Sequence, residues 1–407
     1  PGRPLIRVPV PPGPHGVTAL TAPLRAALAG TGPAIAPIPV VSPTTSTDYV
    51  QQLLRATRPD DAAFPLETEE VAVVLATSGS TQNPKGVLHS RTTLTALSAA
   101  VQGDAATAPQ WIATLPVTSM GGFNVVLRAL EVGLEAIAVP SLGGASPFTP
   151  EAFVEAVRLA RERSTDVRVS LVAAQVRRLL SDPAGTDAMR ACAQILVGGG
   201  PLPIVTAQAA ADAGVALTTT YGATETAGGC VYNSTPLRGV RIMIDSHDKE
   251  IVLSGPMVAL GYRCEPLLTA ERFVDGGYRT GDIGAFDGSL AITGRRDDVV
   301  TINGVNVAIN AVEEALAGCD GVQAAAVVAL PEAGDELRLF AAVTVQDRAE
   351  DPAAFRARLR TEVVAALGVA AAPRYFALVA ELPMLPNGKI DRRALLELAQ
   401  NGVEWQR

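Results

Sequence analysis

The stretch VAVVLATSGSTQNPKG, residues 71–86, does most to decide the fold. Its first seven residues are mainly apolar and β-branched, and they predict a short buried strand. The polar loop that follows offers small residues that let backbone amides approach phosphate oxygens, hydroxyl donors and a cation, Lys85. The loop lacks the GxxxxGK[ST] spacing of a Walker A motif. The stretch therefore predicts a strand followed by a phosphate-binding loop, with an ordinary polar strand–helix connection as the alternative.

Outward from this stretch, apolar runs alternate with amphipathic segments. Further strands are expected at 110–116, 136–140, 167–172, 195–200 and 216–222, and helices at 48–57, 91–101, 123–130, 150–163, 174–181 and 203–213. Such alternation predicts a large α/β domain of doubly wound parallel sheets, in which ligands bind at the carboxyl ends of the strands. Residues 1–70, rich in Pro, Ala and Thr, are expected to form an irregular edge with one or two helices.

The pattern changes twice toward the C-terminus. Between 238 and 294, short apolar runs separated by turns predict an antiparallel β subdomain, with VALGY (258–262) as one of its strands. After GRRDD (294–298), mixed helices and strands predict a small α+β domain. We therefore expect a large domain over 1–296 and a small domain over 297–407, in keeping with the size at which single cores stop growing.

Composition excludes several classes of protein. The chain has 407 residues, a formal net charge of −8 and no Lys/Arg-rich run, which argues against a nucleic-acid partner. Its four cysteines lack zinc-ribbon or redox spacing, and its three histidines argue against a His-rich metal site. No run reaches the ~18 apolar residues of a membrane span, and PGRPLIRVPVPPGPHG lacks the apolar core of a signal peptide. We expect a cytoplasmic protein with reduced thiols and no membrane association.

Two further motifs follow predicted strands. In TTTYGATETAGG (218–229), the carboxylate of Glu225 beside the hydroxyl of Thr224 suits Mg²⁺ and a phosphate oxygen. A lone loop glutamate is more often a solvated charge, which is the plainer interpretation. In LVGGGPLP (196–203), three glycines permit close backbone contact with a flat ligand, although Gly-rich turns are common.

Two more motifs lie near and beyond the expected domain boundary. YRTGDIGAFDG (278–288) contains Asp282, whose carboxylate can accept two hydrogen bonds at once. PMLPNGKIDRRAL (383–395) places Lys389 in a Pro/Gly turn before a helix, where a cation can stabilise charge that develops at a phosphate. Each segment has a plainer interpretation, since GRRDD can be a surface charge cluster and Lys389 an exposed turn lysine.

In this order, the motifs resemble those of the acyl-adenylate-forming superfamily, which includes acyl-CoA synthetases, luciferases and peptide-synthetase adenylation domains. The resemblance implies ATP and Mg²⁺ as ligands, a small domain that moves about the hinge residue Asp297, and catalytic roles for Lys389, Thr224 and Glu225, with Glu225 also holding the metal. In the superfamily, Tyr221 would stack on adenine and Asp282 would bind the ribose. The implied ATP site consists of Thr77, Ser78, Gly79, Ser80, Thr81, Lys85, Gly198, Gly199, Gly200, Pro201, Thr220, Tyr221, Gly222, Asp282 and Arg295.

The acid is indicated by two segments. Residues 221–244 and 170–180 resemble the o-succinylbenzoate–CoA ligases of menaquinone synthesis, which implies coenzyme A as co-substrate. LPVTSMGGFNVV (115–126) departs from these ligases, because they commonly have a histidine at or beside positions 118–119; Ala174 stands where threonine is often seen. Another aromatic or alicyclic acid therefore stays open. The implied acyl pocket includes Ser119, Gly121, Gly122, Phe123, Asn124, Gln175 and Gly228.

The resemblance also implies a reaction in two steps. A carboxylate attacks the α-phosphorus of ATP, pyrophosphate leaves, and the thiol of coenzyme A then attacks the acyl-adenylate. An enzyme that loads a carrier protein presents the same thiol and stays an alternative, as does a nucleotide-binding protein without catalytic activity. A homodimer is expected from the superfamily alone.

Overall fold

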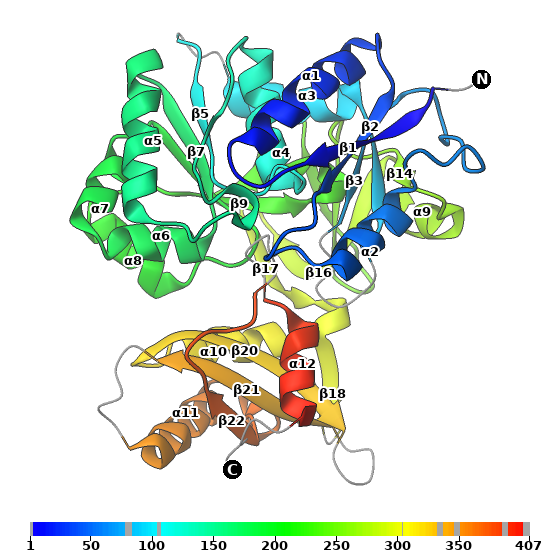
Figure 1. Ribbon diagram of the computed structural model, residues 1–407. Helices are drawn as coiled ribbons and strands as arrows, with labels where there is room; N and C mark the ends of the chain where they lie inside the picture. The colour runs from blue at the N-terminus through cyan, green and yellow to red at the C-terminus, as the bar shows by residue number, and fades with distance from the viewer. Residues whose placement is uncertain are drawn as a thin grey trace.

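The computed structural model describes residues 3–77, 84–103, 107–302, 304–331, 337–345, 351–384 and 390–401. The strand expected at 71–77 is present as β3 (Val71–Ala76), and every one of its first five residues is buried. It lies in a sheet of order β1-β2-β3-β4-β14, in which β1, β2 and β3 run parallel and β4 (Gly86–Ser90) runs antiparallel to β3. The large domain built on this sheet stands above the small domain in Figure 1.

The irregular edge expected over residues 1–70 was wrong, although the region does contain two helices, one of them at the expected 48–57. This region forms a parallel unit of β1 (Leu5–Val10), α1 (His15–Ala29), β2 (Ala34–Pro39) and α2 (Thr47–Thr57). The strand β2 was not predicted, because its sequence AIAPIP contains two prolines and proline is unfavourable inside a central strand. Burial overrides that propensity, because the first five residues of β2 are inaccessible between β1 and β3.

The second sheet has the order β11-β10-β9-β8-β7-β5-β6, and its strands from β6 to β9 are parallel. These strands are β5 (Gln110–Ala113), β6 (Ile137–Ala138), β7 (Val167–Leu171), β8 (Gln194–Val197), β9 (Thr218–Ala223), β10 (Gly228–Tyr232) and β11 (Thr235–Pro236). The helices around them are α3 (Arg91–Gln102), α4 (Met120–Glu131), α5 (Pro150–Arg163), α6 (Ala173–Leu180), α7 (Pro183–Arg190) and α8 (Ile204–Asp212). Only α7 was not expected from the sequence.

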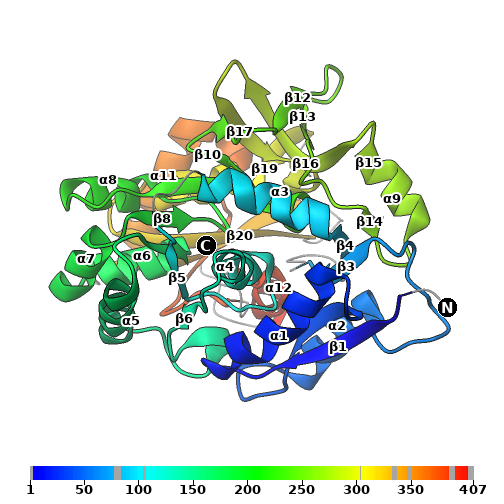
Figure 2. The ribbon, with the colours of Figure 1, turned by 90° about the horizontal axis from the view of Figure 1, so that it is seen from above.

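Helix α4 packs between the two sheets. In Figure 2 it lies at the centre, between α1 and β5. Its Phe123 is fully buried in a core that also contains Val73 of the first sheet and Trp111 of the second. Because α4 is anchored on both sides, its first turn has a fixed position at the carboxyl ends of the strands.

A third, antiparallel sheet contains β12 (Arg241–Ile244), β13 (Glu250–Ser254), β15 (Phe273–Val274), β16 (Gly277–Phe286) and β17 (Leu290–Arg295). The assignment of VALGY to this subdomain was wrong. Its end forms β14 (Gly261–Tyr262), which pairs with β4 of the first sheet. Helix α9 (Pro266–Arg272) then returns the chain to the third sheet, a crossing that local sequence patterns do not encode.

The small domain begins after η3 (Arg296–Asp298), the 3-10 turn in which the expected boundary falls. It contains the hairpin β18 (Val299–Ile302) and β19 (Val305–Ala308), the three-stranded sheet β20 (Val322–Pro331), β21 (Leu337–Val345) and β22 (Tyr375–Leu378), and the helices α10 (Ile309–Ala317), α11 (Pro352–Leu367) and α12 (Arg392–Asn401). It has its own apolar core around Leu316, Val327 and Leu359. Arg177 of α6 reaches across to donate to the Gln323 carbonyl at 3.1 Å. The expected α/β fold with a β subdomain and a small α+β domain is confirmed. Within the described ranges, no helix combines the length and apolar character needed to span a bilayer.

Candidate active site

A carboxylate, a phenol and a guanidinium meet where the second and third sheets adjoin. The hydroxyl of Tyr221 on β9 donates to Oδ2 of Asp282 on β16 at 2.6 Å, and Nη1 of Arg295 lies 3.0 Å from Oδ1. Burial, followed by the neighbouring Asp282 charge, raises the pKa of the Tyr221 phenol, so the phenol keeps its proton and acts as a donor. The structure thus brings together Tyr221, Asp282 and Arg295, three members of the predicted ATP site.

The adjoining glycines let the ends of β8, β9 and β10 approach one another. A Cβ on Gly198 would lie 2.5 Å from Oγ1 of Thr220, and a Cβ on Gly222 would lie 2.2 Å from the Gly228 carbonyl oxygen. Gly199 has a φ of +85°, which favours glycine. Gly200 and Pro201 follow at the open end of β8, with no atom within 4 Å of a Cβ placed on Gly200. The backbone here is therefore bare enough to meet a flat ligand.

The ends of the predicted phosphate loop are closed by two hydrogen bonds. The amide of Thr77 donates to the Lys85 carbonyl at 2.8 Å, and the Lys85 amide donates to Oγ1 of Thr77 at 3.0 Å. Nζ of Lys85 lies 5.4 Å from the centre of the Tyr262 ring. The loop residues Ser78, Gly79, Ser80 and Thr81 lie outside the described residues.

Glu225 is a nearly buried carboxylate, 6% exposed, in the 3-10 turn η2 (Thr224–Thr226). The Tyr262 hydroxyl donates to its Oε1 at 2.8 Å, and the Ala259 amide donates to its backbone carbonyl at 2.8 Å. Burial, followed by the Glu225 charge, raises the pKa of Tyr262. Tyr262 could not be assigned to the site from the sequence, because its approach to Glu225 depends on the unexpected pairing of β14 with β4.

His89 is a second residue that sequence reasoning missed. It lies at the end of β4, is fully buried, and has Nε2 2.9 Å from the Thr224 carbonyl oxygen and Nδ1 3.2 Å from Oγ1 of Thr93. Because a carbonyl accepts, Nε2 carries the hydrogen. Burial lowers the pKa of His89 to about 4, so the imidazole is neutral near pH 7. It fixes the turn that presents Thr224 and Glu225.

The predicted acyl-pocket residues lie around the start of α4. Asn124 donates to the Ala227 carbonyl at 2.7 Å, next to Gly228, whose φ is +114°. A Cβ on Gly122 would lie 2.3 Å from two carbonyl oxygens, and a Cβ on Gly121 would lie 3.2 Å from Leu115. Glycine is thus needed at the first turn of α4, where it packs against the 115–116 segment.

Gln175, another member of the predicted pocket, lies in the first turn of α6. Its side chain accepts from the Val172 amide at 3.1 Å and donates to the Thr114 carbonyl at 3.3 Å. It therefore joins the carboxyl ends of β5 and β7 near the start of α4. Phe123, in contrast, faces the core.

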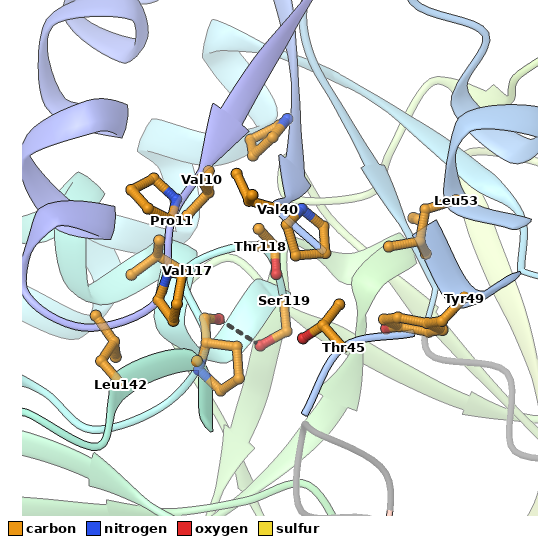
Figure 3. A pocket seen from close by; sticks show the side chains of 16 residues that line it. Val10, Pro11, Val40, Thr45, Tyr49, Leu53, Val117, Thr118, Ser119 and Leu142 are labelled. Atoms are coloured by element: carbon orange, nitrogen blue, oxygen red, sulfur yellow. Dashed lines mark hydrogen bonds between the residues drawn. The ribbon is translucent and has the colours of Figure 1, made fainter. Parts of the chain in front are cut away.

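A cavity opens beside this region, with an empty volume of about 720 Å³ that includes its mouth. Figure 3 shows Val10, Val40 and Leu142 around it, with Tyr49 of α2 on one side and Ser119 on another. The Ser119 hydroxyl donates to the Pro116 carbonyl at 2.7 Å. Of the predicted acyl-pocket residues, only Ser119 lines this cavity, and none of its described lining residues is charged.

Lys389, the predicted catalytic lysine, lies outside the described residues. The segment that contains it is bounded by an antiparallel bridge between Met384 and Ile390. The backbone of Asp297 lies in η3, and its side chain is outside the described part of the structure. The hinge and lysine roles therefore stay predictions.

Family comparisons agree with this geometry. The model of the AMP-binding enzyme family matches residues 26–263, and the model of the AMP-binding enzyme C-terminal domain matches residues 311–389. The chain belongs to the AMP-binding enzyme family, and the resemblance to acyl-adenylate-forming enzymes is confirmed. It is an enzyme of the AMP-forming ligase class.

Individual relatives within this family are similar to the chain over most of its length. The chain is 34% identical to a probable 2-succinylbenzoate–CoA ligase of Mycobacterium tuberculosis, over 93% of this chain and 95% of the relative. The amide bond synthetase McbA from Marinactinospora thermotolerans has a similar structure, with a TM-score of 0.78 and 25% identity over 97% of this chain and 89% of that one. The o-succinylbenzoate CoA synthetase of Bacillus subtilis, solved with its acyl-adenylate intermediate, shares the fold, with a TM-score of 0.71 and 20% identity over 100% of this chain and 90% of that one.

Proposed function

We propose that this chain is an ATP-dependent acid–CoA ligase that forms an acyl-adenylate and then a thioester, with 2-succinylbenzoate as its acid. The similarity to the probable 2-succinylbenzoate–CoA ligase of Mycobacterium tuberculosis, along nearly the whole of both chains, is the observation that supports this most. The arrangement of Tyr221, Asp282 and Arg295 supports the nucleotide half of the proposal.

The residues assigned to the site have distinct tasks in this proposal. Asp282 accepts both ribose hydroxyls, and the Tyr221 ring lies against adenine. Lys85 and the amides of its loop bind the terminal phosphates, so that the acid carboxylate can attack the α-phosphorus in line with the departing pyrophosphate. Lys389 offsets the charge at that step and leaves when the small domain turns about Asp297.

Glu225 fits a Mg²⁺ ion. Mg²⁺ is usually held by one or two carboxylates together with substrate phosphates and water, so a single buried carboxylate beside a phosphate loop suffices. Among the residues that the structure describes, no cluster of three or more acidic, His or Cys side chains offers a competing metal site. When bound, the ion would neutralise phosphate charge. Glu225 itself is oriented by Tyr262.

The second half-reaction brings the thiol of coenzyme A to the acyl carbon, where it displaces AMP. The chain then needs no nucleophilic side chain of its own. A carrier protein presents the same thiol and is the second acceptor to test. We also propose that the enzyme acts in the cytoplasm, as part of menaquinone synthesis, and that it forms a homodimer.

The proposal is tested by pyrophosphate release with MgATP and a panel of acids, with and without coenzyme A. The panel contains 2-succinylbenzoate, benzoates and short aliphatic acids, and the thioester product is identified by mass. Release that is specific to 2-succinylbenzoate, with formation of its CoA thioester, is the expected result. If pyrophosphate is released only with another acid, the adenylation reaction stands but 2-succinylbenzoate is rejected as the substrate. That result would point to the 115–126 segment, which lacks histidine, as the cause of the altered specificity. Transfer of the acyl group to a carrier protein but not to free coenzyme A would reject coenzyme A as the acceptor.

A further inference from the structure

Glu250, the first residue of β13, is a carboxylate that is completely buried beside the nucleotide site. A buried carboxylate is costly unless it is paired and hydrogen-bonded. Its two oxygens contact β16, which carries Asp282, and Arg296, the first residue of the turn η3 between the domains; Oε1 also lies near Arg272 of α9.

The first contact holds a bulge in β16. Glu250 pairs with Ile283 and Val252 pairs with Arg279, so that residues 280–282 bulge out opposite a single residue of β13. The Gly281 amide donates to Oε1 of Glu250 at 2.7 Å. Gly281 has a φ of +78°, which turns the backbone at this point. The bulge is what aims Asp282 at Tyr221.

The second contact holds the start of η3. Nη1 of Arg296 lies 3.4 Å from Oε2 of Glu250 and 3.3 Å from Oδ2 of Asp248. Arg279 is closer still, with Nη2 2.6 Å from the same Oε2, and Nη1 of Arg272 lies 3.7 Å from Oε1. Arg296 immediately precedes the predicted hinge residue Asp297. Its ion pairs with Glu250 and Asp248 therefore hold the backbone next to the hinge.

We propose that Glu250 is a positioning residue that couples nucleotide binding at Asp282 to the hinge through Arg296. This inference rests on the proposed function, because it takes Asp282 as the ribose ligand. A nucleotide that holds Asp282 stiffens the bulge, which fixes the Glu250 carboxylate and so favours the anchored state of Arg296. Coupling between two sites is reciprocal, so the anchored hinge in turn favours nucleotide binding.

The test measures amide hydrogen exchange in residues 296–302 of the full chain, with and without MgATP and in the absence of acid. In the native chain, MgATP should slow this exchange by about tenfold, within the usual range of coupling between sites. Arg296→Met keeps the length of the side chain but removes its charge, and Glu250→Gln keeps an acceptor for the Gly281 amide but removes the ion pairs. Both variants should lose the effect of MgATP and bind it several-fold more weakly. Arg296→Lys should restore part of it.

Arg158→Met is the matched control, since Arg158 forms exposed ion pairs with Glu155 and Glu162 on α5, away from the site. It should retain the full response. A merely structural role of Arg296 would lower the melting temperature without changing the dependence on nucleotide. If Arg296→Met keeps the native response to MgATP, the coupling is rejected while the proposed function stands. If the native chain binds no MgATP, the proposed function fails and the coupling fails with it.

Discussion

The phenol of Tyr221 donates a 2.6 Å hydrogen bond to the carboxylate of Asp282, a residue 61 positions further along the chain. The bond joins a parallel strand of the second sheet to an antiparallel strand of the third. It orients the Asp282 carboxylate before any ligand arrives, and such preorganisation lowers the cost of binding.

Removal of this phenol should weaken nucleotide binding. We expect Tyr221→Phe to raise the Kd for MgATP by about tenfold or more, because one hydrogen bond to a charged group is worth roughly 1.5–3 kcal/mol. Calorimetric titration measures the change. Tyr375→Phe, in the small domain, is the control and should leave the Kd unchanged; an unaltered Kd in Tyr221→Phe would reject the orienting role.

Substitution of the predicted catalytic lysine, Lys389, should affect the two half-reactions differently. Lys389→Ala should slow adenylation by about 10²- to 10³-fold, the usual effect of removing a group that stabilises developing charge. Thioester formation from supplied acyl-adenylate should be largely preserved. Rapid-quench measurement of each step checks this, with the exposed Arg393→Ala as control. Equal losses in both steps would show that the role assigned to Lys389 is wrong.

The neutral His89 makes stability depend on pH. Its pKa is lowered by burial from an ordinary 6.5 to about 4, so the unfolded chain binds a proton more readily than the folded chain. The stability from this group is therefore complete above about pH 6.5 and is lost as the pH falls from 6.5 to about 4, by about 3 kcal/mol in total.

Urea unfolding of the native chain and of His89→Gln tests this contribution. The glutamine amide can still donate toward the Thr224 carbonyl but does not titrate. The free energy of unfolding of the native chain should fall more steeply below pH 6.5 than that of the variant. Parallel curves down to pH 4.5 would show that His89 does not act in this way.

Gly228 is needed for a close approach as well as for its backbone conformation. A Cβ there would lie 2.5 Å from Nδ2 of Asn124, and its φ of +114° is unfavourable for other residues. We expect Gly228→Ala to destabilise the fold by about 2–4 kcal/mol. Gly276→Ala isolates the conformational part, because Gly276 has a φ of +71° and open space around it. Equal losses of free energy would mean that the contact with Asn124 adjusts without cost.

The sequence predicted the elements that are encoded locally. Helix α5 matches its expected range, because Thr149 caps it and Pro150 occupies its first turn. The motif residues Tyr221 and Asp282 could also be assigned to one site, because their segments match a known order of motifs. Their contact with each other could not be predicted from spacing, since it requires two sheets to meet.

Contacts that depend on long-range pairing were missed. Tyr262 reaches Glu225 because β14 joins the first sheet, and His89 reaches Thr224 across 135 positions. Residues 10–53 contribute much of the lining of the apolar cavity, from the ends of β1 and β2, the loops that follow them and α2, and prolines in β1 and β2 weakened the strand signal there. The local sequence pattern contains no information on which distant strand will become a neighbour. The shape of the acyl site depends on such long-range strand pairing, so it could not be predicted.

The central claim is that the acid becomes an acyl-adenylate, and oxygen transfer tests it most directly. The acid is prepared with ¹⁸O in its reacting carboxylate and is turned over with MgATP and coenzyme A, and the products are weighed by mass spectrometry. Attack of that carboxylate on the α-phosphorus, followed by thiol attack at the acyl carbon, leaves one ¹⁸O in AMP and none in pyrophosphate. This is the result we predict. Unlabelled AMP, or label in an inorganic phosphate product, would contradict the acyl-adenylate route.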